Sequence, residues 1–275
     1  MKLSDFATFL ATRLLPVRAP LRSFDDGQLY ISLTSHAPRF KYLDACLKSL
    51  LSQSLKPTGV LLWIEKKDLG RLPASVLRLR RKGLTILECE NGLRSYCKII
   101  PALERYPRAF LVTADDDYIY PRDWLAGLVE AYQPGQREVL CYRAHQIATA
   151  DEKPDLFRAW SRTSPTGISS PLLFALGYGG VLYPPGILGP GATDRIFLDL
   201  SPTGDDIWLY FMARRNGATI RRIPGGRATR LPSANIASLK RINLAEDQAQ
   251  HQRNLDAMVD RFGFPTDDNR QAIAS

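Results

Sequence analysis

Three consecutive carboxylates, Asp115, Asp116 and Asp117, directly follow the apolar stretch AFLVTA at residues 109–114. Adjacent like charges repel, and ionised groups near an apolar core are costly to desolvate. A divalent cation would offset both effects, because Mg²⁺ and Mn²⁺ commonly join one or two carboxylates to the phosphates of a substrate. The alternative is a solvated turn with a helix cap, although Asp123 is closer to the helix start. The run alone does not decide between the two.

A second acidic pair, Asp205 and Asp206, opens a helical segment about ninety residues later. Capping of the helix and compensation of its dipole explain one of these acids but do not require both. A carboxylate facing the same cleft as a metal could act as a general base toward a hydroxyl nucleophile. Two acidic sites in a chain with surplus positive charge therefore suggest transfer of a group from a phosphorylated donor.

The elements that must position these acids alternate along the first half of the chain. Apolar runs predict strands at residues 29–35, 60–65, 84–90 and 109–114, with helices at 42–54, 95–106 and 121–132 between them. This pattern is typical of an α/β domain with a mostly parallel sheet, whose ligands collect at the carboxyl ends of the strands. The less regular second half predicts a strand at 180–183, a helix at 203–217, a strand at 218–223 and a final helix at 246–262.

Composition limits the class of protein only broadly. The chain has 275 residues, of which 45% are hydrophobic and 24% are charged, as in an ordinary globular protein. Its formal charge of +9 favours anionic partners such as nucleic acid, phosphorylated small molecules or an acidic membrane face. For any single cluster of arginines and lysines, we favour a solvated basic surface as the explanation.

The cysteines and histidines are few. Cys46, Cys89, Cys97 and Cys141 show no CxxC pairing, and three of them lie in apolar stretches. We therefore expect a reduced chain with buried thiols rather than a disulfide framework. With three histidines, a histidine-rich zinc site is not expected.

The first 21 residues are partly apolar, but Asp5, Arg13 and Arg18 interrupt them well short of a membrane-spanning helix. They could form a short amphipathic helix that touches a membrane or packs on the body of the protein, and we favour packing. A cytoplasmic protein is expected, with peripheral contact at the inner membrane face as the open alternative.

Five segments occur in an order that resembles bacterial family-2-like glycosyltransferases of the GT-A fold. They are ISLTSHAPRF, RSYCKIIPAL, FLVTADDDYIYPRDWL, GYGGVLYPPG and GDDIWLYFMARRNG, which together span residues 31–217. The resemblance implies a single GT-A domain at residues 27–235, with a helical extension at 1–26 and a helical segment at 236–275 packed on it. It also implies a nucleotide-sugar donor, Mn²⁺ or Mg²⁺ held by a DxD-type motif, and inversion at the anomeric carbon.

The same resemblance implies roles for individual residues. The nucleotide-sugar would contact Thr34, Ser35, Arg39, Arg94, Ser95, Lys98, Asp115 and Asp116. Asp115 and Asp117 have the DxD spacing, whereas alignment on the following YIYP makes Asp116 the metal ligand, so all three are candidates. Asp206 corresponds to the catalytic base of the family, and its neighbour Asp205 stands where the family usually has Glu.

The acceptor would be a glycan or a lipid-linked glycan in the synthesis of bacterial surface polysaccharide. Gly179 and Gly180 resemble the loop beneath the acceptor, and Trp160 is a candidate exposed platform for a sugar ring. The alternatives are a sugar nucleotidyltransferase or another metal-dependent enzyme that uses nucleotides, and a basic nucleic-acid-binding module. A sugar nucleotidyltransferase would need a glycine-rich loop after the first strand, and this chain has no glycine there. A nucleic-acid-binding module would leave both acidic clusters unexplained, so we expect no nucleic acid partner. The oligomeric state is open.

Overall fold

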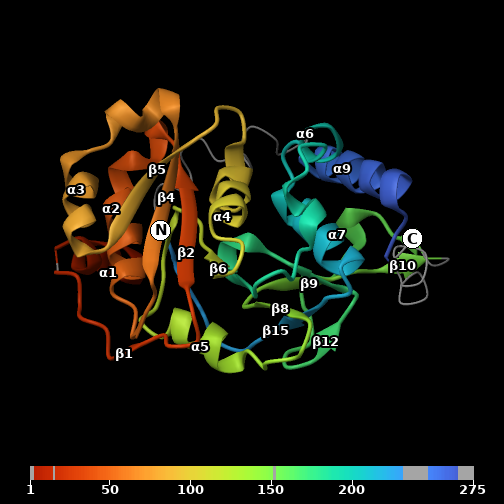
Figure 1. Ribbon diagram of the computed structural model, residues 1–275, viewed down its shortest axis with the longest axis horizontal. Coiled ribbons are helices and arrows are strands. Elements are labelled where there is room, and N and C mark those ends of the chain that lie inside the picture. Colours follow the sequence, from red (N-terminus) through yellow and green to blue (C-terminus); the bar gives the residue numbers. More distant parts are fainter. Residues whose placement is uncertain (1–2, 15, 151–152, 232–246, 266–275) are drawn as a thin grey trace.

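A computed structural model describes residues 3–14, 16–150, 153–231 and 247–265. Its centre is an eight-stranded sheet in the order β12-β15-β8-β14-β6-β2-β4-β5 (Figure 1). The strands of this sheet are β2 Leu29–Ser35, β4 Gly59–Glu65, β5 Leu84–Cys89, β6 Phe110–Thr113, β8 Glu138–Cys141, β12 Ser169–Ser170, β14 Val181–Tyr183 and β15 Thr219–Arg222.

The sheet is mostly parallel, as the sequence predicts. β2 pairs in parallel with both β4 and β6, and β4 with β5, whereas β14 runs antiparallel between β6 and β8. The predicted strand at residues 29–35 is confirmed to the residue, and the predicted strands near 60–65, 84–90, 109–114, 180–183 and 218–223 are confirmed within one residue at each end. Because β2 and β6 are parallel neighbours, their carboxyl ends lie at the same edge.

Helices cover both faces of the sheet (Figure 1). They are α1 Leu3–Leu14, α2 Phe40–Leu51, α3 Ala74–Leu77, α4 Ile100–Arg105, α5 Trp124–Ala131, α6 Phe197–Leu200, α7 Asp205–Arg215 and α9 Asp247–Phe262. The other strands that the structure describes are short and form two-stranded sheets: β1 Arg22–Ser23 with β3 Leu55–Lys56, β7 Tyr118–Ile119 with β16 Thr229–Arg230, β9 Ala144–Gln146 with β13 Leu173–Ala175, and β10 Thr149–Ala150 with β11 Lys153–Pro154.

Successive side chains of the central strands point to opposite faces of the sheet, so the core consists of two layers. In β4, Leu62 and Ile64 pack with the residues of α2 and α5, whereas Leu61 and Trp63 pack with those of α4, α7 and α9. A strand buried on both faces must be apolar at every position, which explains its continuous apolar run.

The ends of the chain add helices to this body. α1 packs on α2 by burying Phe9, and α9 packs on α6 and α7. The segment predicted as one helix at 95–106 is a 3₁₀ helix over Arg94–Lys98 followed by α4, with Pro101 in the first turn of α4. Proline has no amide hydrogen to donate, so it is tolerated there and not deeper in a helix.

Candidate active site

The triple aspartate lies beside the carboxyl end of β2. Ser35, the last residue of β2, and Arg39, shortly after it, both bond to Asp116. Ser35 Oγ donates a hydrogen bond to Asp116 Oδ2 at 2.5 Å, and Arg39 Nη1 lies 2.5 Å from Asp116 Oδ1. Asp116 is only 4% exposed. Ser35 and Arg39, predicted to contact a nucleotide, therefore satisfy a buried carboxylate of the protein itself.

Asp117 has spare bonding capacity. It is buried, and its Oδ1 has no hydrogen-bond partner among the described residues, while Oδ2 lies 3.8 Å from Arg39 Nη1. Burial, reinforced by the charges of Asp115 and Asp116, raises the pKa of Asp117 to about 7. A buried carboxylate oxygen without a partner, close to two other carboxylates, fits a divalent cation.

Hydrogen bonds to the Tyr120 side chain hold the loop that carries these acids in place. Its phenol accepts a hydrogen bond from the Asp115 amide at 2.8 Å and donates one to the Asp115 carbonyl at 3.2 Å. The Tyr120 amide in turn donates to Ser49 Oγ of α2 at 3.1 Å. The acidic loop is thereby attached to α2, which restricts where its carboxylates can point.

Lys98 joins the two acidic clusters. Its buried Nζ lies 2.9 Å from Asp115 Oδ1 and 3.1 Å from Asp205 Oδ2. Burial alone would lower the pKa of Lys98, but Asp115, Asp205 and Asp206 together raise it well above its usual value. Lys98 is predicted to meet the donor, and in the structure its ammonium group lies between acids from two distant segments.

Asp206 occupies the other side of this cluster and is half-buried. The Gly177 amide lies 3.2 Å from both carboxylate oxygens of Asp206 and donates to them. Burial and the charge of Asp205 raise the pKa of Asp206 to about 7, against the opposing effects of Lys98 and the Gly177 amide. A carboxylate with this pKa can accept a proton near neutral pH, whereas Asp205 is buried and paired with Lys98.

Gly179 and Gly180 pack against the protein rather than against an open acceptor space. The Gly179 carbonyl accepts a hydrogen bond from Trp124 Nε1 at 2.8 Å. Gly180 has φ +100°, and a Cβ there would overlap the Trp124 ring, while a Cβ at Gly179 would overlap Arg143. The glycine that faces the acids is Gly177, which sequence reasoning missed because three glycines stand within four residues of one another.

The expectation that Trp160 is an exposed platform is wrong. Trp160 is 4% exposed, packs on Phe157 and Phe174, and donates from Nε1 to the Asp155 carbonyl at 3.0 Å. Its apolar ring is stabilised by this core contact and presents no free face to a sugar.

A different aromatic pair, in which Tyr178 is exposed and Tyr118 is half-buried, lies at the site. Tyr178 is 39% exposed and stacks on Tyr118, with 5.8 Å between ring centroids. Tyr118 follows Asp117 in the chain, and Tyr178 follows Gly177, so the pair lies between the two acidic clusters. Nothing in the sequence distinguishes these tyrosines from the other nine.

Three predicted contacts of the nucleotide-sugar remain: Thr34 on β2, and Arg94 and Ser95 on the loop after β5. Thr34 donates from Oγ1 to the Trp63 carbonyl at 2.9 Å, which ties it to β4. Arg94 is exposed and has φ 51°, an uncommon conformation for a residue with a side chain. Ser95 Oγ is buried and has no hydrogen-bond partner among the described residues. Of these three, only Arg94 has an exposed side chain that a ligand could contact.

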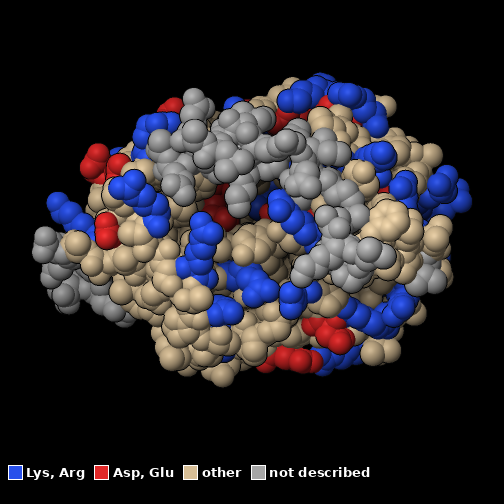
Figure 2. All heavy atoms as spheres, turned by 180° about the vertical axis from the view of Figure 1, so that it is seen from behind, with Lys and Arg blue, Asp and Glu red and all other residues tan. Residues whose placement is uncertain are grey.

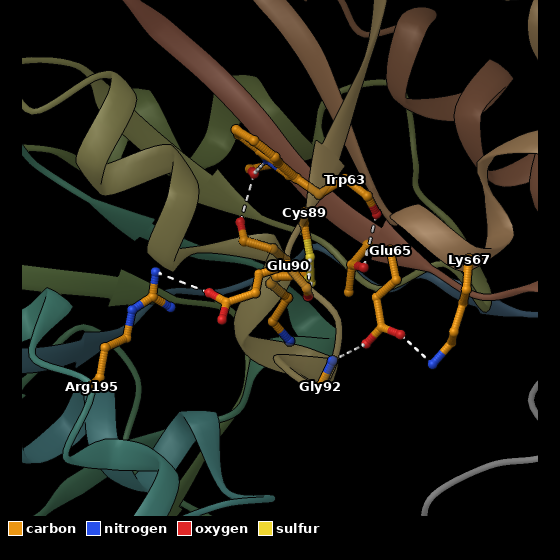
Figure 3. The surroundings of a disulfide bond; sticks show 11 residues. Trp63, Glu65, Lys67, Cys89, Glu90, Gly92 and Arg195 are labelled. Atoms are coloured by element: carbon orange, nitrogen blue, oxygen red, sulfur yellow. Dashed lines mark hydrogen bonds and ion pairs between the residues drawn. A yellow bond between two sulfur atoms is a disulfide. The ribbon is translucent and has the colours of Figure 1, made fainter.

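This loop is closed by a disulfide between Cys89 and Cys97, so the prediction that all four cysteines are buried thiols is wrong for this pair (Figure 3). Cys46 and Cys141 are buried and free, as predicted. The pairing arises because β5 ends at Cys89 and the chain turns back within eight residues, which no sequence spacing rule identifies.

One ion pair and one hydrogen bond attach the same loop to its neighbours (Figure 3). The Gly92 amide donates to Glu65 Oε1 at 3.1 Å, and Arg195 Nη2 lies 3.6 Å from Glu90 Oε2. Both contacts precede the 3₁₀ helix that ends at Lys98, so they help to set the path on which Lys98 reaches the acids.

Charge is unevenly distributed over the surface. On the face drawn in Figure 2, lysine and arginine side chains gather across the middle, and the acidic side chains lie mainly near the rim apart from one recessed group. Such a surface attracts anionic ligands. Within the described ranges, no group of three or more His, Cys, Asp or Glu side chains is arranged to hold a metal ion, and no helix is long and apolar enough to cross a bilayer.

No family profile matches the sequence, and no curated protein matches it. Among solved structures, the mannosyltransferase PcManGT from Pyrobaculum calidifontis in complex with GDP-Man and Mn²⁺ is 16% identical, with a TM-score of 0.50, over 98% of this chain and 76% of that one. GalNAc-T7 with UDP, GalNAc and Mn²⁺ is 12% identical, with a TM-score of 0.50, over 84% of this chain and 54% of that one.

A third structure, S. aureus TarS 1-349 in complex with UDP, is 14% identical, with a TM-score of 0.45, over 70% of this chain and 57% of that one. The chain thus spans little more than half the length of TarS 1-349 and of GalNAc-T7. At these identities the likeness to PcManGT and GalNAc-T7 establishes architecture and not activity. The chain has the fold of the GT-A glycosyltransferases.

Proposed function

We propose that this protein is a metal-dependent glycosyltransferase that moves a sugar from a nucleotide-sugar donor to a hydroxyl of a glycan or lipid-linked acceptor, with inversion, in bacterial surface polysaccharide synthesis. The observation that carries the proposal is the convergence of two acidic clusters on Lys98, at the carboxyl edge of the sheet. One cluster has a spare carboxylate oxygen and the other a carboxylate with pKa about 7.

Asp117 would hold the metal, with Asp115 as the second carboxylate. Ser35 and Arg39 bond both oxygens of Asp116, whereas Lys98 bonds Oδ1 of Asp115 and leaves Oδ2 for the ion. This choice favours the DxD spacing over a role for Asp116. Two protein carboxylates suffice for Mg²⁺ or Mn²⁺ when substrate phosphates complete the coordination. When bound, the ion would supply positive charge that stabilises the departing nucleoside diphosphate. The structures of PcManGT and GalNAc-T7 both contain Mn²⁺, which supports this assignment.

Asp206 accepts the proton of the acceptor hydroxyl. The acceptor oxygen forms a bond to the anomeric carbon, the bond from that carbon to the phosphate oxygen breaks, and its electron pair leaves with the nucleoside diphosphate. Attack from the face opposite the phosphate inverts the configuration. The Gly177 amide orients the carboxylate of Asp206, and Lys98 neutralises Asp205 beside it.

The exposed ring of Tyr178 takes the acceptor sugar in place of the buried Trp160. A tyrosine offers an apolar face for stacking, and its neighbour Tyr118 supports the ring from behind. Because Tyr178 follows Gly177 directly, a sugar stacked on it lies near Asp206.

The test is calorimetric titration of the wild type and two variants with UDP and GDP in Mn²⁺, with excess chelator as the parallel condition. Asp117→Asn is expected to weaken binding of the preferred nucleotide about tenfold or more, because a neutral amide is a poor metal ligand. Asp123→Asn removes an exposed aspartate six residues further on and should bind as the wild type does. Unchanged binding in Asp117→Asn, or equal binding in chelator, would falsify the metal role.

A second arm concerns the base. Asp206→Asn should bind the nucleotide normally and lower turnover about 10²-fold or more, whereas Asp199→Asn, an exposed acid on α6, should turn over normally. A wild type that binds neither nucleotide but binds oligonucleotide in a salt-sensitive manner is a nucleic-acid-binding protein instead.

A further inference from the structure

The N-terminal segment carries an unusual share of the exposed apolar side chains. Nine large hydrophobic residues are exposed among those that the structure describes, and four of them fall within residues 6–21. Those four are Phe6, Leu10, Leu14 and Leu21, with exposed fractions of 47%, 39%, 79% and 77%. Single exposed hydrophobic residues are ordinary, but a local cluster of them marks an interaction surface.

Three of them form a stripe along α1. Phe6, Leu10 and Leu14 are spaced four residues apart, so their side chains lie on the same side of the helix. The helix is held to the body by other residues: Phe9 is buried against Tyr42, with ring centroids 5.5 Å apart. The stripe thus flanks the buried Phe9, and each of its three residues is at least 39% exposed.

A salt bridge strengthens this attachment. Arg13 Nε lies 3.3 Å from Asp44 Oδ2 of α2, on a carboxylate that is almost completely buried. α1 thus presents its apolar stripe from a fixed position, and no rearrangement of the helix is needed to expose it.

The surroundings of the helix end are cationic. A cavity of about 170 Å³ lies there, and its lining includes Arg18, Lys48 and Arg122 but no carboxylate. Arg122 donates to the carbonyls of Ala19 at 2.7 Å and Ser52 at 3.0 Å, which fixes the segment after α1. In the sequence, residues 1–22 contain four basic residues and one acid. Arg13 is paired with Asp44 and Arg22 with Glu130, so the positive charge beside the apolar stripe comes from Arg18, Lys48 and Arg122.

We propose that α1 docks this protein on the surface of a bilayer that contains anionic phospholipids, with the stripe of Phe6, Leu10 and Leu14 in the outer acyl region and Arg18 near the phosphates. A bilayer of this kind supplies an apolar region and a layer of negative charge together, which matches the two properties of the segment. A helix of 12 residues is about 18 Å long, too short to span the hydrocarbon core, so it would lie in the interface.

Docking would bring the acidic loop close to the bilayer. α1 contacts β16, and β16 pairs with β7, which directly follows the triple aspartate. Through α1 and β16, the bilayer surface would therefore be connected to the strand that follows the proposed metal ligands. Bilayer binding requires no nucleotide sugar, so this inference goes beyond the proposed function and can fail independently of it.

The test is co-sedimentation of the full chain with vesicles of phosphatidylcholine, with or without about 30 mol % phosphatidylglycerol. The wild type should sediment with the anionic vesicles, and less so at high salt. A variant with Phe6→Ser, Leu10→Ser and Leu14→Ser should bind about tenfold more weakly or not at all. The matched control carries Leu77→Ser, Leu156→Ser and Ile168→Ser, three exposed positions elsewhere, and should bind as the wild type does.

Two further measurements keep the result interpretable. Melting temperatures of both triple variants should equal that of the wild type, because all six positions are exposed. Arg18→Gln, at an exposed position, should reduce the preference for phosphatidylglycerol without changing the melting temperature. Equal vesicle binding by the two triple variants overturns the proposal. The proposal is also overturned if the wild type does not bind the vesicles and sedimentation velocity shows that it self-associates through the stripe.

Discussion

Lys98 Nζ lies 3.1 Å from Asp205 Oδ2, so a cation from the loop before α4 meets the first residue of α7. Its backbone is also fixed, because the Lys98 carbonyl accepts a hydrogen bond from Ser32 Oγ at 2.6 Å, and Ser32 Oγ accepts one from Trp63 Nε1 at 2.9 Å. The buried ammonium group is thus positioned by the central sheet and compensates charge from both acidic clusters.

Lys98→Met should destabilise the protein by about 3–5 kcal/mol, because it leaves buried carboxylates without their counter-charge. Denaturant titration at pH 8 measures the free energy of unfolding. Lys67→Met breaks the exposed pair with Glu65 and should leave the free energy of unfolding nearly unchanged. A loss below about 1 kcal/mol in Lys98→Met would show that the acids are compensated by other groups.

Turnover at saturating donor and Mn²⁺ should rise with pH and level off above about 7. Asp206 must be ionised to accept a proton, and burial followed by the charge of Asp205 raises the pKa of this group to about 7. Below that pH the rate should fall about tenfold per pH unit, as the ionised fraction does. Asp206→Asn should lose this dependence. A wild-type inflection near 4, the ordinary range of aspartate, contradicts the assignment.

Gly177→Ala and Gly180→Ala should separate activity from stability. A Cβ at Gly177 would lie 3.0 Å from both Asp206 Oδ1 and Lys98 Nζ, so turnover should fall more than stability. A Cβ at Gly180 would overlap Trp124 in a left-handed backbone conformation and should cost about 1–3 kcal/mol. Melting curves and turnover measure both effects. Gly70→Ala, which has open space and ordinary backbone angles, should change neither.

Tyr178→Ala should raise the KM for the acceptor about tenfold, whereas Tyr178→Phe should leave it unchanged, because stacking needs the ring and not the hydroxyl. Hydrolysis of the donor without acceptor should be equal in both variants and the wild type. If donor hydrolysis and acceptor KM change together in Tyr178→Ala, the ring supports the site in general and does not bind the acceptor specifically.

Reduction should destabilise the wild type by about 2–3 kcal/mol, the loop-closure contribution for a disulfide that joins residues eight apart. Cys97→Ser should show the same loss without reductant and no further loss with it. Denaturant titrations with and without dithiothreitol measure both. A wild type that does not respond to reductant would mean that the bond between Cys89 and Cys97 does not stabilise the fold.

Local patterns predicted much of the sheet because a buried strand is marked by the apolar residues of the strand itself. A strand buried on both faces needs a continuous apolar run, and the stretches at residues 29–35 and 60–65 have one. The same reasoning located the acids of residues 115–117 at a strand end. The helix predicted at 203–217 was also found, as α7, because two acids at its start and Gly217 at its end mark its limits.

Side-chain partners between distant segments could not be predicted in this way. The sequence suggested that Ser35, Arg39 and Lys98 would meet a ligand, yet all three bond to aspartates of the chain. The aromatic ring of Trp160 is of a kind that stacks on sugars, but neighbouring residues bury it. Burial of a single side chain depends on which elements pack over it, and a local pattern does not contain that information.

The sequence by itself determined that carboxylates would stand at the carboxyl edge of a parallel sheet, because apolar periodicity fixes where a buried strand ends. Only the tertiary structure decided which carboxylates are compensated, by Arg39 for Asp116 and by Lys98 for Asp115 and Asp205. Electrostatic compensation falls off over a few ångströms, so it is set by the folded distances between charges and not by their spacing along the chain.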